Sequence, residues 1–335
     1  MKEIPNMNGS TRVKLLATLG LAAVIGLTSC GAQSMSSTQD DPSSKASQDA
    51  WSFTDSSYQK TTTLEQAPDS IVVDSYSAAA LWDYGVRPTG VFGYGLTEDG
   101  GLSVGNADVS QMTIIGKDAE FNLEKLLSLD PDVIIGYGNA EGTGWTWWDE
   151  KVQSEATSTA PYLPIKSGGR PVQAVIEDYA ELAKALGGDT NSASAVQDKK
   201  EFTDRLSTLK EIAEQKPGLK IIALNGYDDL YVGQKTIGQL ALLEDLGFEI
   251  TGPTDTSAWA SLSWEKVGDF PADVVLSYSG TAEQVKDHPV FSSLPAVKAQ
   301  QVVEWDDKRP YTYGSYVQWF DQLIDVLQDA KALNS

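Results

Sequence analysis

The side chains of this sequence that could hold a ligand are mainly aromatic. Three indoles, Trp145, Trp147 and Trp148, lie close together in a glycine-containing stretch. Flat aromatic faces and hydroxyl groups suit a wide, amphipathic ligand. Core packing is the better explanation for any single aromatic residue, so the prediction depends on the group. The candidate ligand-binding residues, all expected in loops after strand ends, are Tyr76, Tyr94, Tyr137, Trp145, Trp147, Trp148, Arg170, Tyr227, Trp259, Tyr278, Arg309, Tyr311 and Tyr313.

Few residues of the chain could hold a bare metal ion. A zinc or manganese site usually combines several histidines with carboxylates, and the sequence contains only His288. Haem would need an axial His, Met, Tyr or Cys ligand, which Met112 and the tyrosines leave open. A metal that arrives inside a chelate needs only shape, aromatic surface and a few charges from the protein. We therefore predict no metal held by the protein itself and no cofactor.

A different chemistry, hydrolysis by a serine nucleophile, has one sequence signal. The segment Gly101-Leu102-Ser103-Val104-Gly105 fits the G-x-S-x-G pattern of hydrolases, and His288 could supply a base. A nucleophile elbow requires an apolar strand before the serine and a helix after it. Ser103 instead follows the polar segment Thr97-Glu98-Asp99-Gly100. The sequence therefore favours a binding protein over an enzyme.

The segments that would position these residues occur twice. Leu123-Glu124-Lys125-Leu126 and Pro131-Asp132-Val133-Ile134-Ile135 return as Trp264-Glu265-Lys266-Val267 and Ala272-Asp273-Val274-Val275-Leu276, each shifted by 141 positions (124 to 265, 132 to 273). Tyr137 and Tyr278 are related by the same shift. The repeat predicts two similar lobes, and a cleft between two lobes is a common place for a ligand.

Each half alternates short apolar runs with helical patterns, which indicates parallel strands covered by helices. The predicted strands are residues 70–74, 89–94, 133–137, 220–225, 249–251, 273–277 and 301–305. The predicted helices are residues 78–84, 123–129, 236–246, 264–270 and 316–332. The expected fold class is α/β, with two similar Rossmann-like lobes built on mainly parallel sheets.

One long helix is predicted between the two halves. Residues 193–215 carry Val196, Phe202, Leu206, Leu209 and Ile212 at near-helical spacing, and a Pro-Gly pair follows them. A continuous helix is stiffer than a pair of strands, so we expect the lobes to open and close only slightly. The predicted organisation is a signal peptide at 1–29, a flexible tether at 30–55, an N-terminal lobe at 56–190, a linker helix at 191–216 and a C-terminal lobe at 217–335.

The N-terminus predicts export and a lipid anchor. Basic residues precede an apolar stretch, Leu15 to Leu27, that is short for a membrane span and typical of a secretory signal. The stretch ends at Leu27-Thr28-Ser29-Cys30, which resembles the lipobox of bacterial lipoproteins, whose cysteine is diacylated. Cys30 is the only cysteine of the chain, so no intramolecular disulfide can form. An ordinary cleaved signal or an uncleaved membrane helix is the alternative.

The chain is strongly acidic, with a formal net charge of −22. Removal of residues 1–29 takes away three basic groups and one acidic group, which leaves −24. This charge argues against nucleic acid or anionic lipid as a binding partner. It does not decide the charge of the ligand, because the outer surface need not match the cleft.

From Pro68 to about Asp329 the sequence resembles the substrate-binding lipoproteins of ABC importers, in particular the helix-linked class that serves ferric siderophores, haem and cobalamin. The segments that carry the resemblance are Ile71-Val72-Val73-Asp74-Ser75, Gly85-Val86-Arg87-Pro88-Thr89-Gly90-Val91, Asn122-Leu123-Glu124-Lys125, Asp130-Pro131-Asp132-Val133-Ile134-Ile135, Leu262-Ser263-Trp264-Glu265, His288-Pro289-Val290-Phe291 and Leu294-Pro295-Ala296-Val297-Lys298-Ala299-Gln300. The resemblance implies an exported, lipid-anchored monomer on the outer face of the cytoplasmic membrane, with an ABC permease dimer and its cytoplasmic ATPase as partners.

The resemblance also implies roles for the repeated glutamates. In similar proteins an exposed carboxylate on each lobe docks onto one permease subunit, and Glu124 and Glu265 are the matching positions. A structural explanation competes, because Asn122 and Ser263 are plausible helix caps and a glutamate in the first turn is favoured by the helix dipole.

The ligand implied by the resemblance is a ferric siderophore, with cobalamin or haem as the alternative. A tricatecholate complex carries several negative charges and would require a basic cluster. The candidate loops supply mainly Arg170 and Arg309, with Lys117 and Lys166 as further cations. We therefore expect a neutral or weakly charged hydroxamate complex.

Overall fold

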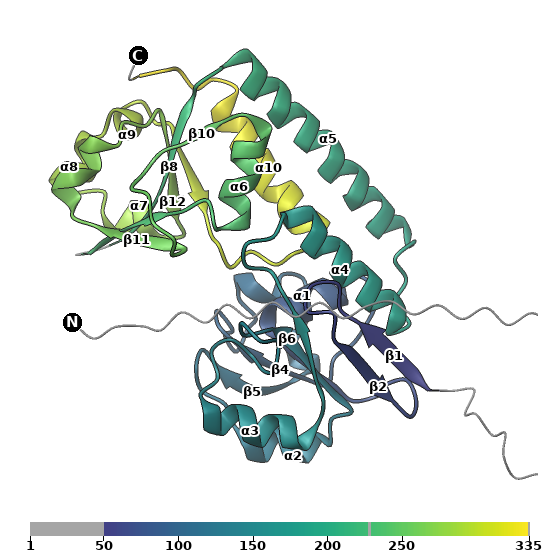
Figure 1. Ribbon diagram of the computed structural model, residues 1–335. Helices are drawn as coiled ribbons and strands as arrows, with labels where there is room; N and C mark the ends of the chain where they lie inside the picture. Colours follow the sequence, from purple (N-terminus) through teal and green to yellow (C-terminus); the bar gives the residue numbers. More distant parts are fainter. Residues whose placement is uncertain (1–49, 227–228, 334–335) are drawn as a thin grey trace, which may run out of the picture. The chain divides into compact units, whose positions relative to one another are not determined.

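The computed structural model describes residues 50–226 and 229–333 (Figure 1). Cys30, the predicted signal peptide and Tyr227 lie outside the described residues. The described chain forms two α/β lobes, each built around its own sheet, and a long helix runs between them. The predicted fold class is therefore confirmed.

The N-terminal lobe contains a sheet of five parallel strands in the order β5-β4-β3-β6-β7. The central strand is a run of buried residues, as expected for a parallel strand covered on both faces. The strands are β3 (Ile71–Asp74), β4 (Gly90–Gly93), β5 (Thr113–Lys117), β6 (Val133–Tyr137) and β7 (Tyr162–Ile165). The helices are α1 (Ser75–Trp82), α2 (Leu123–Leu129), α3 (Glu150–Thr159) and α4 (Val172–Ala185), with 3-10 turns η1 (Leu102–Val104) and η2 (Val109–Gln111).

The C-terminal lobe contains a mixed sheet in the order β11-β9-β8-β12-β13, with β10 parallel to the start of β8. Strand β9 runs antiparallel to both of its neighbours. The strands are β8 (Lys220–Gly226), β9 (Leu230–Gly233), β10 (Glu249–Ile250), β11 (Trp259–Leu262), β12 (Val274–Tyr278) and β13 (Val302–Trp305). The helices are α6 (Gly238–Leu246), α7 (Thr281–Gln284), α8 (Pro289–Ser293), α9 (Pro295–Lys298) and α10 (Tyr313–Leu327), with a 3-10 helix, η3 (Trp264–Asp269), where an ordinary helix was predicted.

The repeated aspartates perform the same task in the two lobes. Asp132 donates its backbone N–H to Ser70 O at 2.9 Å, and its Oδ2 accepts from Ser70 N at 2.9 Å. Asp273 donates its N–H to Lys220 O at 2.8 Å, and its Oδ2 accepts from Lys220 N at 2.9 Å. Each carboxylate therefore ties the start of one strand to the start of the neighbouring strand. The sequence repeat is a structural repeat.

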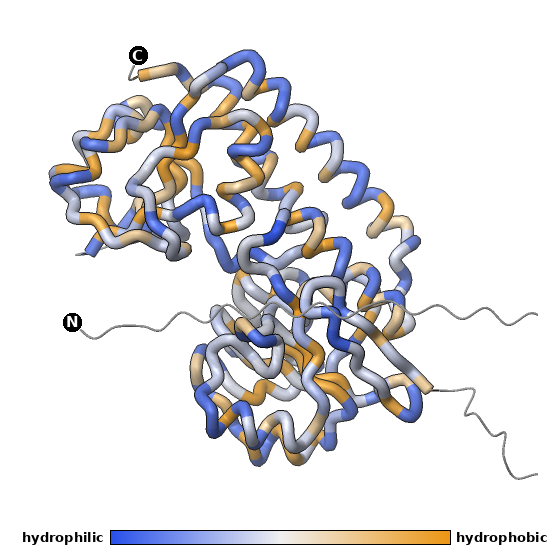
Figure 2. Tube along the Cα trace, in the orientation of Figure 1, coloured by the Kyte–Doolittle hydropathy of each residue, from blue (hydrophilic) through white to orange (hydrophobic). Residues whose placement is uncertain are grey.

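The linker helix α5 spans Ala193–Gln215 and packs lengthwise against α10 (Figure 1). Ser192 Oγ accepts from Ala195 N at 3.2 Å and caps its N-terminus. Figure 2 shows hydrophobic and hydrophilic residues alternating along α5, as expected for a helix with one buried face. Val196, predicted on that face, is instead 55% exposed.

The folded part of the chain begins at a lower residue number than predicted. Strands β1 (Trp51–Thr54) and β2 (Thr61–Leu64) form an antiparallel hairpin. Trp51 is buried, and its Nε1 donates to Ala185 O at 2.7 Å. The tether predicted over residues 30–55 therefore overlaps the folded protein by the whole of β1, because a buried indole ties that strand to the end of α4. None of the helices in the described ranges combines the length and hydrophobicity that a membrane crossing requires.

Candidate ligand-binding cavity

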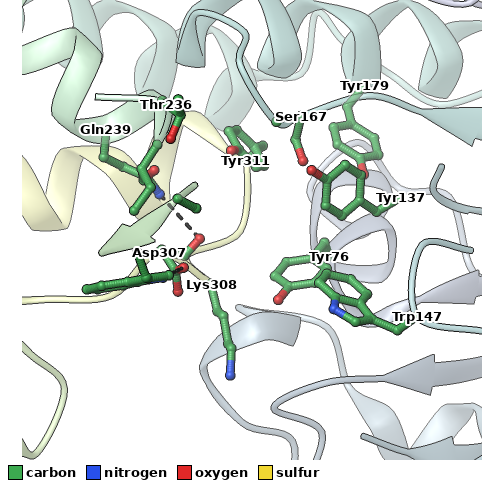
Figure 3. Close-up of a pocket in the computed structure, with 15 residues that line it drawn as sticks. Tyr76, Tyr137, Trp147, Ser167, Tyr179, Thr236, Gln239, Asp307, Lys308 and Tyr311 are labelled. Carbon is green, nitrogen blue, oxygen red and sulfur yellow. Dashed lines mark hydrogen bonds between the residues drawn. The ribbon is translucent and has the colours of Figure 1, made fainter. Parts of the chain in front are cut away.

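A cavity of about 360 Å³ lies between residues of the two lobes (Figure 3). The N-terminal lobe contributes Tyr76, Tyr137, Trp147, Ser167, Gly168 and Tyr179. The C-terminal lobe contributes Thr236, Ile237, Gly238, Gln239, Ala258, Trp259, Asp307, Lys308 and Tyr311. A concave site with aromatic walls and a few polar groups is typical of a small-molecule site.

Asp74 fixes the N-terminal wall of the cavity. Its Oδ1 accepts from Ser77 N at 2.8 Å and caps α1, which places Tyr76 in the first helical turn. Its Oδ2 accepts from Tyr137 N at 2.7 Å, at the end of β6. Burial raises the pKa of the Asp74 carboxyl, and the hydrogen bonds from Ser77 and Tyr137 oppose that effect. One buried residue therefore positions two lining tyrosines.

Asp307 organises the C-terminal wall in a similar way. Its Oδ2 accepts from Trp259 Nε1 at 3.0 Å, and its Oδ1 accepts from Tyr278 OH at 3.1 Å. The two aromatic rings meet edge to face, with their centroids 5.6 Å apart. Gln239 Nε2 donates to the backbone oxygen of Asp307 at 3.5 Å, the dashed line in Figure 3. Sequence reasoning missed Asp307, although its position two residues after the predicted strand 301–305 was a usable signal.

The charged side chains among the lining residues are one carboxylate, Asp307, and one ammonium group, Lys308. Lys308 Nζ lies 5.5 Å from the ring centre of Tyr94, which belongs to the other lobe. Burial raises the pKa of the Tyr76 hydroxyl, and the nearby Asp307 raises it further. Burial likewise raises the pKa of Tyr311, so both phenols stay neutral. The lining thus offers aromatic faces and neutral hydroxyls around a balanced pair of charges.

Comparison with known proteins places the chain in a family. Residues 93–309 match the family described as "Periplasmic binding protein", which is more than half of the chain. The chain belongs to this family. Its members are substrate-binding proteins, and the resemblance inferred from the sequence motifs is confirmed.

Individual periplasmic binding proteins are similar over most of the chain. The "Fe(3+)-citrate-binding protein YfmC" of Bacillus subtilis is 23% identical over 251 residues, which cover 73% of this chain and 75% of YfmC. DesE, "a ferric-siderophore receptor protein from Streptomyces coelicolor", is 29% identical with a TM-score of 0.78, and the match covers 84% of this chain and 99% of DesE. FeuA of Bacillus subtilis, a "triscatecholate siderophore binding protein", shares the fold at 19% identity with a TM-score of 0.59, over 82% of this chain and 97% of FeuA.

Five of the predicted ligand-binding residues line the cavity of this periplasmic binding protein: Tyr76, Tyr137, Trp147, Trp259 and Tyr311. Two more contact lining residues. Tyr278 bonds to Asp307, and the Tyr94 ring meets Trp147 edge to face with centroids 5.2 Å apart. Of the repeated pair, Tyr137 lines the cavity from the N-terminal lobe, and Tyr278 bonds to the lining residue Asp307 from the C-terminal lobe.

Two of the three clustered indoles face the core instead of the cavity. Trp145 is 1% exposed, and its Nε1 donates to Asp74 Oδ2 at 3.1 Å. Trp148 packs against Phe92 and Phe121. Trp147 is 39% exposed and is the indole of this loop that reaches the cavity. The placement predicted for Trp145 and Trp148 was wrong because the loop folds back beside the end of β6, where Gly138 bridges to Trp145, and both indoles pack into the core of the N-terminal lobe.

Three further candidates also lie away from the cavity lining. Arg170 forms an ion pair with Asp178 of α4. Tyr313 is buried against Phe202 of α5, with ring centroids 5.2 Å apart. Arg309 is buried beside α10, where it donates to Ser315 O. These placements were wrong because each side chain is engaged elsewhere: Arg170 and Arg309 by partners in the helix that follows them, and Tyr313 by a residue of the distant linker helix.

The G-x-S-x-G segment forms a 3-10 turn in which Ser103 and Val104 are buried and the other residues are exposed. Ser103 lies in η1 and is 1% exposed. Its Oγ donates to the backbone oxygen of Tyr94 at 2.9 Å, and the ring of His288 packs against Trp264 in the other lobe. The strand and helix of a nucleophile elbow do not flank Ser103, in agreement with the sequence prediction.

The repeated glutamates occupy equivalent positions on the two lobes. Glu124 lies in the first turn of α2, and Glu265 lies in the first turn of η3. Both side chains are exposed. The Asn122 side chain caps α2 by accepting from Lys125 N at 3.0 Å. The predicted cap at Ser263 makes no side-chain hydrogen bond of this kind. The capping explanation therefore accounts for Glu124 better than for Glu265.

Proposed function

We propose that this protein captures a ferric siderophore outside the cytoplasmic membrane and delivers it to the permease of an ABC importer. The observation that carries the proposal is the cavity between the lobes, with walls of tyrosine and tryptophan. Such walls suit a wide chelate whose iron is already coordinated. The similarity to DesE, a ferric-siderophore receptor, over 84% of the chain supports the same ligand class.

The siderophore we propose is of the hydroxamate type. A ferric tricatecholate carries several negative charges and would require surplus positive charge around it. The negative charge of Asp307 and the positive charge of Lys308 offset each other in the lining. The two arginines expected to supply positive charge lie elsewhere, since Arg170 is paired with Asp178 and Arg309 is buried beside α10. A neutral complex therefore matches this lining better than an anionic complex.

Delivery, in this proposal, uses the two repeated glutamates and a lipid anchor. Glu124 and Glu265 are exposed, and one lies on each lobe, as docking onto two permease subunits requires. A diacylated Cys30 would hold the monomeric protein at the outer membrane face, with residues 31–50 as its tether. A cytoplasmic ATPase bound to the permease would power uptake.

Intrinsic tryptophan fluorescence tests the ligand class directly, because Trp147 and Trp259 line the cavity. The purified protein is titrated with ferric hydroxamates, ferric catecholates, haem and cobalamin. We expect saturable quenching at submicromolar ferric hydroxamate and no saturable quenching by the iron-free chelator. Tighter binding of a tricatecholate than of every hydroxamate would overturn the hydroxamate proposal. Binding of cobalamin or haem alone would overturn the siderophore proposal.

A further inference from the structure

The β1–β2 hairpin contacts the loop that carries Trp147. We call this loop, residues 138–149 between β6 and α3, the indole loop. Tyr58, in the turn between β1 and β2, donates its hydroxyl hydrogen to Gly138 O at 3.0 Å and to Asn139 O at 2.8 Å. Burial raises the pKa of Tyr58 to about 12, so the hydroxyl keeps the proton that it donates. The hairpin therefore binds the backbone of the indole loop where the loop begins.

The Tyr58 ring reaches the backbone of the indole loop because two loop residues lack side chains. A Cβ on Gly138 would lie 2.8 Å from the Tyr58 hydroxyl oxygen, and a Cβ on Gly142 would lie 2.7 Å from Tyr58 Cγ. Contacts this close essentially never occur, so a side chain at either position would displace the ring. Lys60 Nζ adds a hydrogen bond to Gly142 O at 2.9 Å. The hairpin thus holds both the start and the tip of the indole loop.

The turn that presents Tyr58 is itself fixed by a buried carboxylate. Asp55 is 3% exposed, and its Oδ1 accepts from Ser57 N at 2.8 Å and from Tyr58 N at 2.6 Å. Its Oδ2 accepts from Lys60 N at 3.0 Å. Three hydrogen bonds from the backbone to one side chain restrict the turn to one conformation. Tyr58 is therefore held in place before it contacts the loop.

A short path of contacts leads from Tyr58 to the cavity. Gly138, whose carbonyl group accepts from Tyr58, forms the bridge to Trp145, and Trp147 follows two residues later. Trp147 is 39% exposed and meets Tyr137 edge to face, with ring centroids 5.4 Å apart. An indole that is this exposed has packing contacts on only part of its surface. Its position in the cavity wall therefore depends on the backbone of the indole loop.

We propose that Tyr58 is a positioning residue of the ligand-binding cavity, which holds the indole loop so that Trp147 stands in the cavity wall. Tyr58 does not itself line the cavity. Because the loop is already ordered in the free protein, the ligand does not have to order it, and this preorganisation favours affinity. The effect on the ligand rests on the proposed siderophore function, whereas the placement of Trp147 does not.

The variant Tyr58→Phe tests the proposal, because it keeps the ring and removes the hydroxyl group. The affinity of the purified protein for ferric desferrioxamine, a hydroxamate complex, is measured by calorimetric titration. We expect it to weaken about three- to tenfold, as for the loss of one neutral hydrogen bond. In a Trp147→Ala background, Tyr58→Phe should cause no further loss, because Tyr58 acts through Trp147. An equal loss in both backgrounds would overturn the proposal.

The matched control is Thr54→Val, which removes a hydroxyl group from the same hairpin. Thr54 Oγ1 is hydrogen-bonded to Thr61 Oγ1 at 2.7 Å, across the two strands of the hairpin. We expect this variant to keep the full affinity for ferric desferrioxamine, even if its midpoint of thermal unfolding falls. An affinity loss equal to that of Tyr58→Phe would contradict a specific role for Tyr58.

A second measurement needs no ligand and therefore separates this proposal from the siderophore proposal. Acrylamide quenching of Trp147 fluorescence is obtained as the difference between each protein and its Trp147→Phe counterpart. We expect a higher quenching constant for Trp147 in Tyr58→Phe than in the unaltered protein or in Thr54→Val. An unchanged constant would overturn the positioning role of Tyr58, whatever ligand the protein binds.

Discussion

At the scale of single residues, two aspartates position the aromatic walls of the cavity. Asp74 bonds to the start of α1 and the end of β6. In the C-terminal lobe, Asp307 bonds to the indole of Trp259 and the phenol of Tyr278. A carboxylate accepts hydrogen bonds from several donors at once, which is why one acidic residue can orient two aromatic side chains.

The variant Asp307→Asn tests this role. An amide group has only one acceptor oxygen, so the bond from Trp259 Nε1 or the bond from Tyr278 OH is lost. A hydrogen bond to a charged group contributes about 1.5–3 kcal/mol, so we expect siderophore affinity to weaken roughly tenfold or more. Calorimetric titration measures the affinity, and Asp325→Asn, an exposed change on α10, controls for the altered net charge. Equal affinities of the two variants would contradict the role given to Asp307.

At the scale of elements, an aromatic contact anchors the linker helix α5 to α10 of the C-terminal lobe. Phe202 of α5 is 2% exposed and packs against Tyr313 and Phe320 of α10, each with ring centroids 5.2 Å apart. Buried aromatic pairs of this kind stabilise a fold beyond the area that they bury. The linker helix is therefore part of the core of the protein.

Truncation of the Phe202 side chain measures how much this contact contributes to the free energy of unfolding. We expect Phe202→Ala to lower the free energy of unfolding by about 3–5 kcal/mol, because a large buried side chain leaves a cavity. Val196→Ala on the same helix is the matched control, since Val196 is 55% exposed and its loss should change the free energy by less than about 0.5 kcal/mol. Urea unfolding followed by circular dichroism compares the two variants. A similar loss in both would show that α5 is not anchored through Phe202.

At the scale of the whole molecule, one contact joins the lobes across the ligand-binding cavity. Lys308 Nζ lies over the ring of Tyr94, 5.5 Å from its centre. A cation over an aromatic ring contributes roughly 0.5–1 kcal/mol at a partly exposed site. The contact therefore favours the arrangement in which the lobes are close together.

A double-mutant cycle of Lys308→Met and Tyr94→Leu tests this contact in the ligand-free protein. We expect a coupling energy of about 0.5–1 kcal/mol in the free energy of unfolding. A cycle of Lys308→Met with Phe202→Leu, whose aromatic partners lie on α10, serves as the control and should give additive effects. Additivity in both cycles would mean that the contact between Lys308 and Tyr94 does not stabilise the arrangement of the two lobes.

The docking proposal also belongs to the whole molecule. Glu124→Ala combined with Glu265→Ala should abolish uptake of the ferric siderophore while leaving its affinity unchanged, because both side chains are exposed and neither lines the cavity. Glu150→Ala is the matched control, since Glu150 is an exposed residue in the first turn of α3. Uptake of radioactive iron by cells and calorimetric titration separate transport from binding. Normal uptake by the double variant would refute the docking role.

The sequence alone determined the architecture of this protein. The repeat at a spacing of 141 positions predicted two lobes, and in the structure Asp132 and Asp273 join equivalent strands. The periodicity of residues 193–215 predicted a linker helix, placed at 191–216, and the observed helix spans Ala193–Gln215. Such features are local or repeated, so they depend on backbone propensity and on apolar periodicity, which are both written along the chain.

The tertiary structure decided which aromatic side chains line the cavity. Trp145 and Trp147 are two positions apart, but Trp145 bonds to Asp74, which lies 71 residues away in sequence, while Trp147 faces the cavity. The direction of a loop side chain is set by partners that are distant in sequence, and only the folded chain brings those partners together.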